Sequence, residues 1–160
     1  MHLLVVYHSR TGGSRQMAEA AADAAGAEHP VRLLEAPAAT ADDLLAAGGY
    51  LFCAPENLAA LSGPMKDFFD RTYYAVLGRI EGRPYARMVC AGTDGEGALR
   101  QMARVATGWR LKEVQSPLVV RTGAQTPEAV LAPKRIAPAD LDRCRELGAA
   151  LAAGLALGIF

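Results

Sequence analysis

The chain has 160 residues, of which 51% are hydrophobic and 21% are charged. This length fits one domain, residues 1–160, with a continuous core, and the apolar content excludes an intrinsically disordered chain. Lysine and arginine together number 17, as do aspartate and glutamate, so the formal net charge is zero at pH 7. A neutral protein has no overall field that attracts nucleic acid, and we expect no nucleic-acid partner.

Cysteine usage and the first residues predict a cytoplasmic protein. The three cysteines, Cys53, Cys90 and Cys144, contain no C-x-x-C pair, a pattern typical of reduced thiols in the cytosol. Cys53 and Cys90 fall in apolar strand patterns, where we interpret them as small buried side chains. The N-terminal sequence reads as a strand and has no signal-peptide pattern. The three histidines lack metal-ligand spacing, so no metal is expected.

The first part of the chain alternates between strand and helix patterns. Apolar residues 2–7 predict the first strand, and an alanine-rich pattern over 15–25 predicts a helix. A short second strand is expected at 31–34. Thr40 is a suitable cap for a short helix, and residues 49–53 predict the third strand.

The second part continues the alternation. Ser62 and the proline two residues later predict the start of a helix, whose stripe of Met65, Phe68, Phe69 and Thr72 we interpret as core packing. A fourth strand is expected at 87–91, a helix at 97–107 and a fifth strand at 118–120.

The last part of the chain is less regular. Residues 122–138 have no clear period and predict a long loop, whereas 140–157 predict a final helix. Residues 147–160 carry no charge, but they are fewer than the roughly 20 residues needed to cross a bilayer. We therefore expect no membrane span, and interpret this segment as a helix packed on the sheet.

Five strands alternating with five helices predict an α/β fold. The pattern indicates a doubly wound, five-stranded parallel sheet of order 2-1-3-4-5 with helices on both faces. Such sheets bind ligands beyond the carboxyl ends of their strands, where the strand order reverses. We therefore expect the loops after the first, third and fourth strands to carry the function.

The loop after the first strand has the composition of an anion-binding loop. Unpaired N–H groups at a helix start attract anions, glycine lets the backbone approach a ligand, and hydroxyls add donors. The loop lacks the lysine of a Walker loop, the third glycine of a dinucleotide fingerprint and the cysteine of a low-molecular-weight phosphatase. An ordinary helix-start turn is the alternative. Its residues are Ser9, Arg10, Thr11, Gly12, Gly13 and Ser14.

The other two loops are also unusual in composition. The loop after the third strand begins with Pro55, Glu56, Asn57 and Leu58. The loop after the fourth strand is rich in glycine, whose backbone can approach a flat ring and donate N–H groups to it. Glu56 and Asp94 either orient a substrate or cap turns. The candidate residues of this third loop are Gly92, Thr93, Asp94, Gly95 and Gly97.

Together the three loops resemble those of the flavodoxin-like family, in particular NADPH-dependent FMN reductases and WrbA-type NAD(P)H:quinone oxidoreductases. The resemblance covers about residues 3–120 and is carried by the S-x-T-G-x-S loop at 9–14, by Ser62-Gly63 and Phe69-Asp70-Arg71, and by the glycine-rich loop. Glu56 and Leu58 stand where the family often has a hydroxyl residue and an aromatic residue.

The resemblance implies that the protein binds flavin mononucleotide (FMN). The first loop, Ser9 to Ser14, would surround the phosphate. Pro55 to Leu58 would line one edge and face of the ring, and Gly92 to Gly97 the other. NAD(P)H would be the co-substrate, a quinone or similar small molecule the electron acceptor, and a homodimer or homotetramer the assembly. No catalytic side chain is required, because hydride moves between two stacked rings.

Two other functions stay open at this point. One is a one-electron carrier of the flavodoxin type, which the neutral charge disfavours because such carriers are acidic as a family. The other is an FMN-binding or partner-binding module without turnover. His8 either protonates a product or is a strand-end residue bonded to neighbouring backbone, and we favour the second interpretation.

Overall fold

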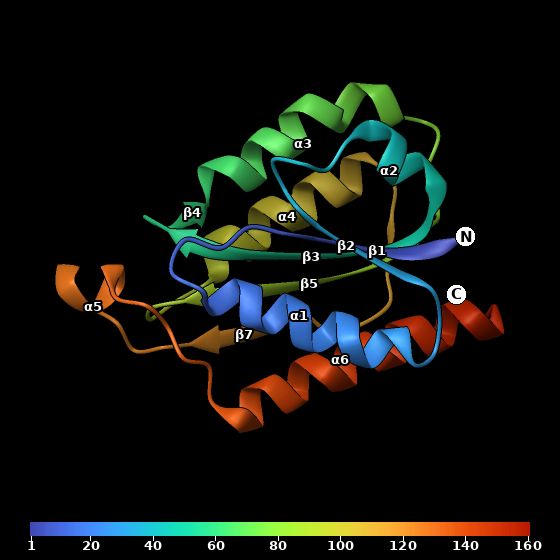
Figure 1. Ribbon diagram of the computed structural model, residues 1–160. Helices are drawn as coiled ribbons and strands as arrows, with labels where there is room; N and C mark the ends of the chain where they lie inside the picture. The colour runs from blue at the N-terminus through green and yellow to red at the C-terminus, as the bar shows by residue number, and fades with distance from the viewer.

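A parallel sheet covered by helices on both faces forms the protein, as the computed structural model of residues 1–160 shows (Figure 1). Its strand order is β2-β1-β3-β5-β6, with β7 also paired to β5. The fifth expected strand, at 118–120, is β7, and β6 is a short additional strand that is also parallel to β5. The doubly wound order is therefore confirmed. The parallel strands are β1 (His2–Tyr7), β2 (Val31–Glu35), β3 (Ala47–Asn57), β5 (Pro84–Ala91), β6 (Lys112–Glu113) and β7 (Leu118–Arg121).

The helices divide between the two faces of the sheet (Figure 1). On one face lie α1 (Gly13–Gly26) and α6 (Pro138–Leu157), which pack against each other. On the other face lie α2 (Ala41–Ala46), α3 (Gly63–Val76) and α4 (Glu96–Gly108). Successive side chains of a strand point to opposite faces, so β1 sends Leu4 and Val6 to one core and Leu3 and Val5 to the other.

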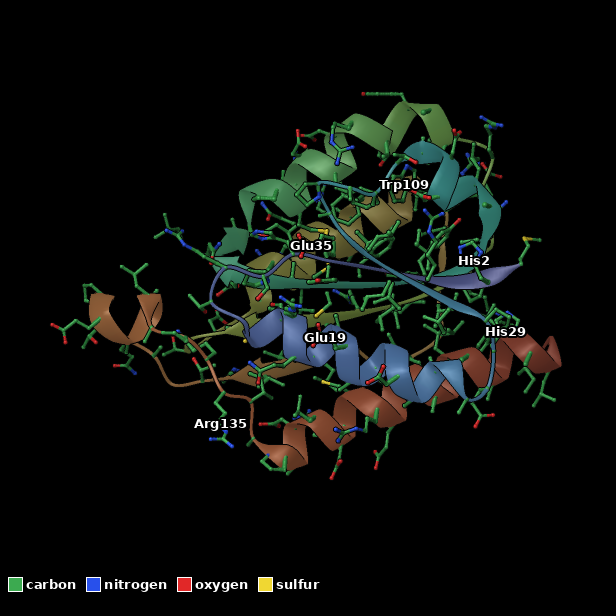
Figure 2. The ribbon with its side chains drawn as sticks, viewed as in Figure 1. His2, Glu19, His29, Glu35, Trp109 and Arg135 are labelled. Carbon is green, nitrogen blue, oxygen red and sulfur yellow. The ribbon has the colours of Figure 1, made fainter.

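Aromatic rings fill the core on the α3 and α4 side. Phe52 of β3 contacts Phe69 of α3 edge to face, with ring centroids 5.3 Å apart. Trp109, directly after α4, lies on the same side of the sheet and donates its indole N–H to the Tyr73 carbonyl at 3.0 Å (Figure 2). Phe68 and Phe69 are buried here, so the stripe in the sequence is core packing, as expected.

Two segments differ from the expectation. The loop after the third strand contains the end of β3 and a short strand β4 (Ala60–Leu61), which pair antiparallel. Leu58 and Ala59 form the turn between them with positive φ angles of 51° and 62°, a conformation usually signalled by glycine or asparagine. The expected loop at 122–138 contains a short helix, α5 (Pro127–Leu131), which Thr126 caps.

The three cysteines are free and buried. Burial raises the pKa of Cys90 and of Cys144 to about 11, and the pKa of Cys53 well above its usual value. All three thiols are therefore protonated at neutral pH and serve as small core side chains, as the sequence indicated for Cys53 and Cys90.

The C-terminal helix lies on one face of the sheet, as expected for the uncharged segment, and packs mainly against α1. Leu147 and Leu151 of α6 are buried in the same core as Met17 of α1. At Gly148 the two backbones are so close that a Cβ atom would overlap the Ala21 carbonyl. No helix combines the length and the apolar character that crossing a membrane requires.

Replacing Gly148 by alanine is expected to lower the free energy of unfolding by about 2 kcal/mol, because the added methyl meets helix backbone that cannot move independently. Gly26→Ala is the control, since no atom lies near its added methyl group, and its change should stay within about 0.5 kcal/mol. Urea unfolding measures both. Equal stability of the two variants would contradict the close packing of α1 and α6.

Candidate functional site

A cavity of about 480 Å³ opens at the carboxyl edge of the sheet, where the strand order reverses. This is the position that the doubly wound order predicts. The volume is within the range of small-molecule sites. The lining residues come from four segments: Arg10, Thr11, Pro55, Glu56, Asn57, Leu58, Cys90, Ala91, Gly92, Thr122, Ala124, Pro127, Val130, Leu131 and Lys134.

The loop between β1 and α1 presents unpaired backbone donors. Gly12 has a φ of 96°, and its N–H donates to the Ser9 hydroxyl at 3.0 Å. The first helical hydrogen bond is the one from Gln16 to the Gly12 carbonyl. The N–H groups of Gly13, Ser14 and Arg15 therefore have no acceptor within the protein. Three such donors at the positive end of a helix dipole can hold an anion.

Ser14 adds a further donor. Its side-chain oxygen is buried, with no hydrogen-bond partner, and the residue is 1% exposed. Gly13 lies so near β5 that a Cβ atom would be 2.7 Å from the Cys90 sulfur. The start of α1 is thus pressed against the sheet, and a buried hydroxyl without a partner is unusual in a folded protein.

The β3–β4 hairpin forms a second wall of the cavity. Its tip is strained, because neither Leu58 nor Ala59 is glycine and both have left-handed backbones. Leu58 is also fully exposed, at 102% of its reference area, although it lines the cavity. Backbone strain and an exposed apolar side chain on one residue are typical of a ligand-contacting position.

Glu56 joins the hairpin to the glycine-rich loop. Its carboxylate accepts hydrogen bonds from Gly95 N–H at 2.9 Å and from Ala98 N–H at 3.2 Å. These groups belong to the start of α4, where a negative charge is stabilised by the helix dipole. A side chain at Gly97 would overlap the Ala59 carbonyl, so the two loops are in backbone contact. Of the two expected roles, Glu56 has the capping one.

Not every expected site residue lines the cavity. Among the candidates, Arg10, Thr11, Pro55 to Leu58 and Gly92 do. The loop between β1 and α1 contains four further candidates that do not line the cavity: Ser9, Gly12, Gly13 and Ser14. Gly95, with a φ of 113°, and Gly97 form the start of α4 instead. The Asp94 carbonyl accepts from Arg121 at 2.9 Å. Ligand contact by these residues and by Thr93 stays a prediction.

A fourth segment of the site was not predicted from the sequence. Thr122, Ala124 and residues of α5 and its C-terminal flank line the cavity. This flank is bonded to the anion-binding loop, because Lys134 N–H donates to the Thr11 carbonyl at 2.8 Å. Threonine followed by proline is typical of a helix start. The pair Thr126-Pro127 is therefore the sequence signal from which α5 could have been predicted.

His8 lies at the end of β1 and is half-buried. Its Nδ1 is 2.8 Å from the Ser62 hydroxyl, so its partner is a side chain rather than the backbone that we favoured. Burial lowers the pKa of His8, Glu35 opposes this shift, and Arg10 adds to it. The residue is not among those that line the cavity.

Comparison with known proteins agrees with the topology. No family model matches the chain. A flavodoxin from Aquifex aeolicus (strain VF5) is 36% identical over 99 residues, 59% of this chain and 52% of that protein. A probable NAD(P)H dehydrogenase (quinone) FQR1-like 2 from Arabidopsis thaliana is 39% identical over 69 residues, 42% of this chain and 25% of that protein. The chain thus spans about half the length of the first relative and about a quarter of the length of the second.

The fold itself has close structural matches. A flavodoxin from the domain Archaea superposes with a TM-score of 0.78, covering 97% of this chain and 99% of that one at 21% sequence identity. The protein therefore has a flavodoxin-like fold, as the resemblance of its loops implied.

Glu56→Ala is expected to lower the free energy of unfolding by about 2 kcal/mol, because two N–H groups at the start of α4 lose their acceptor. Glu96→Ala is the matched control, since it removes an exposed carboxylate from the same helical turn and should change stability by a few tenths of a kcal/mol. Thermal or urea unfolding compares them. Equal losses would show that Glu56 acts only through its charge.

The lowered pKa of His8 predicts a loss of stability on acidification. The unfolded chain takes up this proton near pH 6.5, before the folded protein does, so the folded state is weakened as the pH falls below that value. His8→Gln retains a hydrogen-bonding side chain. Between about pH 7.5 and about pH 5.5, its free energy of unfolding should fall by up to about 1 kcal/mol less than that of the native protein. Urea unfolding at both pH values tests this. An imidazole that titrates above its ordinary pKa by NMR would contradict the assignment.

Proposed function

We propose that the protein binds FMN and passes two electrons from NAD(P)H through it to a quinone or a similar small acceptor. The observation that carries the proposal is the anion site at the start of α1: three N–H groups without acceptors next to a buried, unpartnered hydroxyl. The loop that carries this site also lines, through Arg10 and Thr11, a cavity whose volume suits a nucleotide.

The anion-binding loop suits a phosphate that carries its own negative charge. N–H groups of Gly13, Ser14 and Arg15 would donate to its oxygens, and the Ser14 hydroxyl would gain the acceptor that the protein does not provide. Arg10 adds positive charge to the cavity lining. The loop and this basic side chain therefore fit the phosphate end of FMN.

The hairpin and the glycine-rich loop suit the ring. Pro55 and Leu58 line the cavity and would make apolar contact with one side of the ring. The backbone of Gly92, which has no side chain, would contact the other side. When bound, FMN supplies the hydride and electron chemistry, while the protein orients it and excludes water. Glu56 is committed to α4, so we assign no residue as catalytic.

The choice of NAD(P)H and a small acceptor rests on two further observations. The plant relative is named as an NAD(P)H dehydrogenase (quinone), which favours an enzyme. The formal charge of zero gives no electrostatic steering toward a basic protein partner. We extend the proposal to a cytoplasmic homodimer or homotetramer.

A one-electron carrier is the second candidate, and the relative named flavodoxin favours it. Purified protein titrated with FMN, then mixed with NAD(P)H and a quinone, separates the two functions. Rapid bleaching of the flavin by NAD(P)H and its return with quinone support the enzyme. Slow bleaching, together with a chemical reduction in two separate one-electron steps, supports the carrier. Protein that binds no FMN overturns both.

Ser14→Ala is expected to weaken FMN binding about tenfold while leaving the stability of the ligand-free protein unchanged or slightly higher, because the hydroxyl has no partner in the protein. Riboflavin, which lacks the phosphate, is the control ligand, and its affinity should not change. Quenching of flavin fluorescence measures both affinities. An equal loss for riboflavin would place Ser14 away from the phosphate.

A further inference from the structure

The short helix α5 carries apolar side chains that are about half exposed. None of its residues is buried. Val130 is 48% exposed and Leu131 is 59% exposed, and both line the cavity together with Pro127. Exposed apolar residues scattered singly need no explanation, but these gather around one cavity that the fully exposed Leu58 also lines.

The position of α5 is fixed at both ends, although the helix has no core of its own. Thr126 accepts from Ala129 N–H at 3.2 Å at its start. The Lys134 ammonium donates to the carbonyls of Ala129, Val130 and Ala132, at 2.6–2.9 Å, at its end. These bonds satisfy the ends of a helix that would be too short to form alone.

A second set of bonds ties this segment to the anion-binding loop. The Gln16 amide donates to the carbonyls of Gly12 and Lys134, at 2.9 and 2.7 Å, and accepts from Ile136 N–H at 3.0 Å. The Gln16 side chain, in the first turn of α1, thus joins the anion-binding loop to the segment that follows α5. Figure 1 shows α5 projecting beyond the sheet on the side of the β3–β4 hairpin.

We propose that α5 is the outer wall of the nucleotide site, with Val130 and Leu131 packing on the ring of bound FMN and Gln16 as the positioning residue. The inference rests on the proposed function, because it takes FMN as the occupant. Two observations choose that occupant over a protein partner: the apolar side chains line the cavity itself, and the segment is bonded to the loop that presents the anion donors.

This wall supplies what the other loops lack. Pro55 to Leu58 and Gly92 to Gly97 contain no aromatic side chain to stack on a flat ring. Aliphatic side chains from α5 and from the hairpin can cover the ring instead, and burying them stabilises the complex. The residues of α5 are therefore binding residues contributed from a segment far from the three expected loops in the sequence.

The double variant Val130→Ser, Leu131→Ser tests the wall. It leaves Thr126 and Lys134 in place, so α5 keeps its caps. We expect FMN affinity, measured by fluorescence quenching, to fall about tenfold or more, because two apolar contacts with the ring are lost. Leu157→Ser is the matched control, since Leu157 is equally apolar and 73% exposed but does not line the cavity. Its FMN affinity should match that of the native protein.

Hydrogen exchange gives a readout that does not depend on substitution. Adding FMN to the native protein should slow amide exchange over 126–134, and Gln16→Leu should weaken this protection while FMN still binds. Unchanged affinity in the double variant together with unchanged exchange overturns the inference and leaves the proposed function intact. A native protein that does not bind FMN overturns both. An affinity loss of equal size in Leu157→Ser also contradicts the wall.

Discussion

Parallel pairing is the constraint on which the rest of this structure depends. Each parallel strand must be followed by a crossover, so β1, β3, β5 and β7 all end at the same edge of the sheet. The helices that follow β1 and β3 lie on opposite faces of the sheet. The carboxyl edge between these two strands is therefore left open. Four connections therefore meet around one cavity, and the chain needs only to place suitable residues in them.

Backbone groups and a few polar side chains then fix these connections relative to one another. The Glu56 carboxylate joins the β3–β4 hairpin to the start of α4, and Gln16 joins the start of α1 to the flank of α5. Each tie uses a side chain whose polar atoms are satisfied by backbone groups of another loop. Glu56, the acidic residue that lines the cavity, is thereby already hydrogen-bonded to the start of α4. This is consistent with a site where a bound cofactor would supply the chemistry.

Much of this architecture was predictable from the sequence, because β1 and β3 are almost entirely apolar and the Ser/Thr/Gly loop directly follows β1. The hairpin at Leu58 and Ala59 was not, since tertiary contacts impose a left-handed turn that neither residue prefers. Helix α5 was missed because five residues give no helical period, and its ends depend on Thr126 and Lys134. The capping role of Glu56 depends on two loops meeting in space, which spacing along the chain does not record.

The three buried thiols have a practical consequence. Cys53, Cys90 and Cys144 lie within one core, on β3, β5 and α6, and all are protonated at neutral pH. Cys90 also lines the cavity, but an alkylating reagent can react with Cys53 and Cys144 only when that core opens, since the thiolate is the reactive form and burial excludes the reagent. The rate of alkylation of Cys53 and Cys144 in the native protein thus reports how often the sheet separates from α1 and α6.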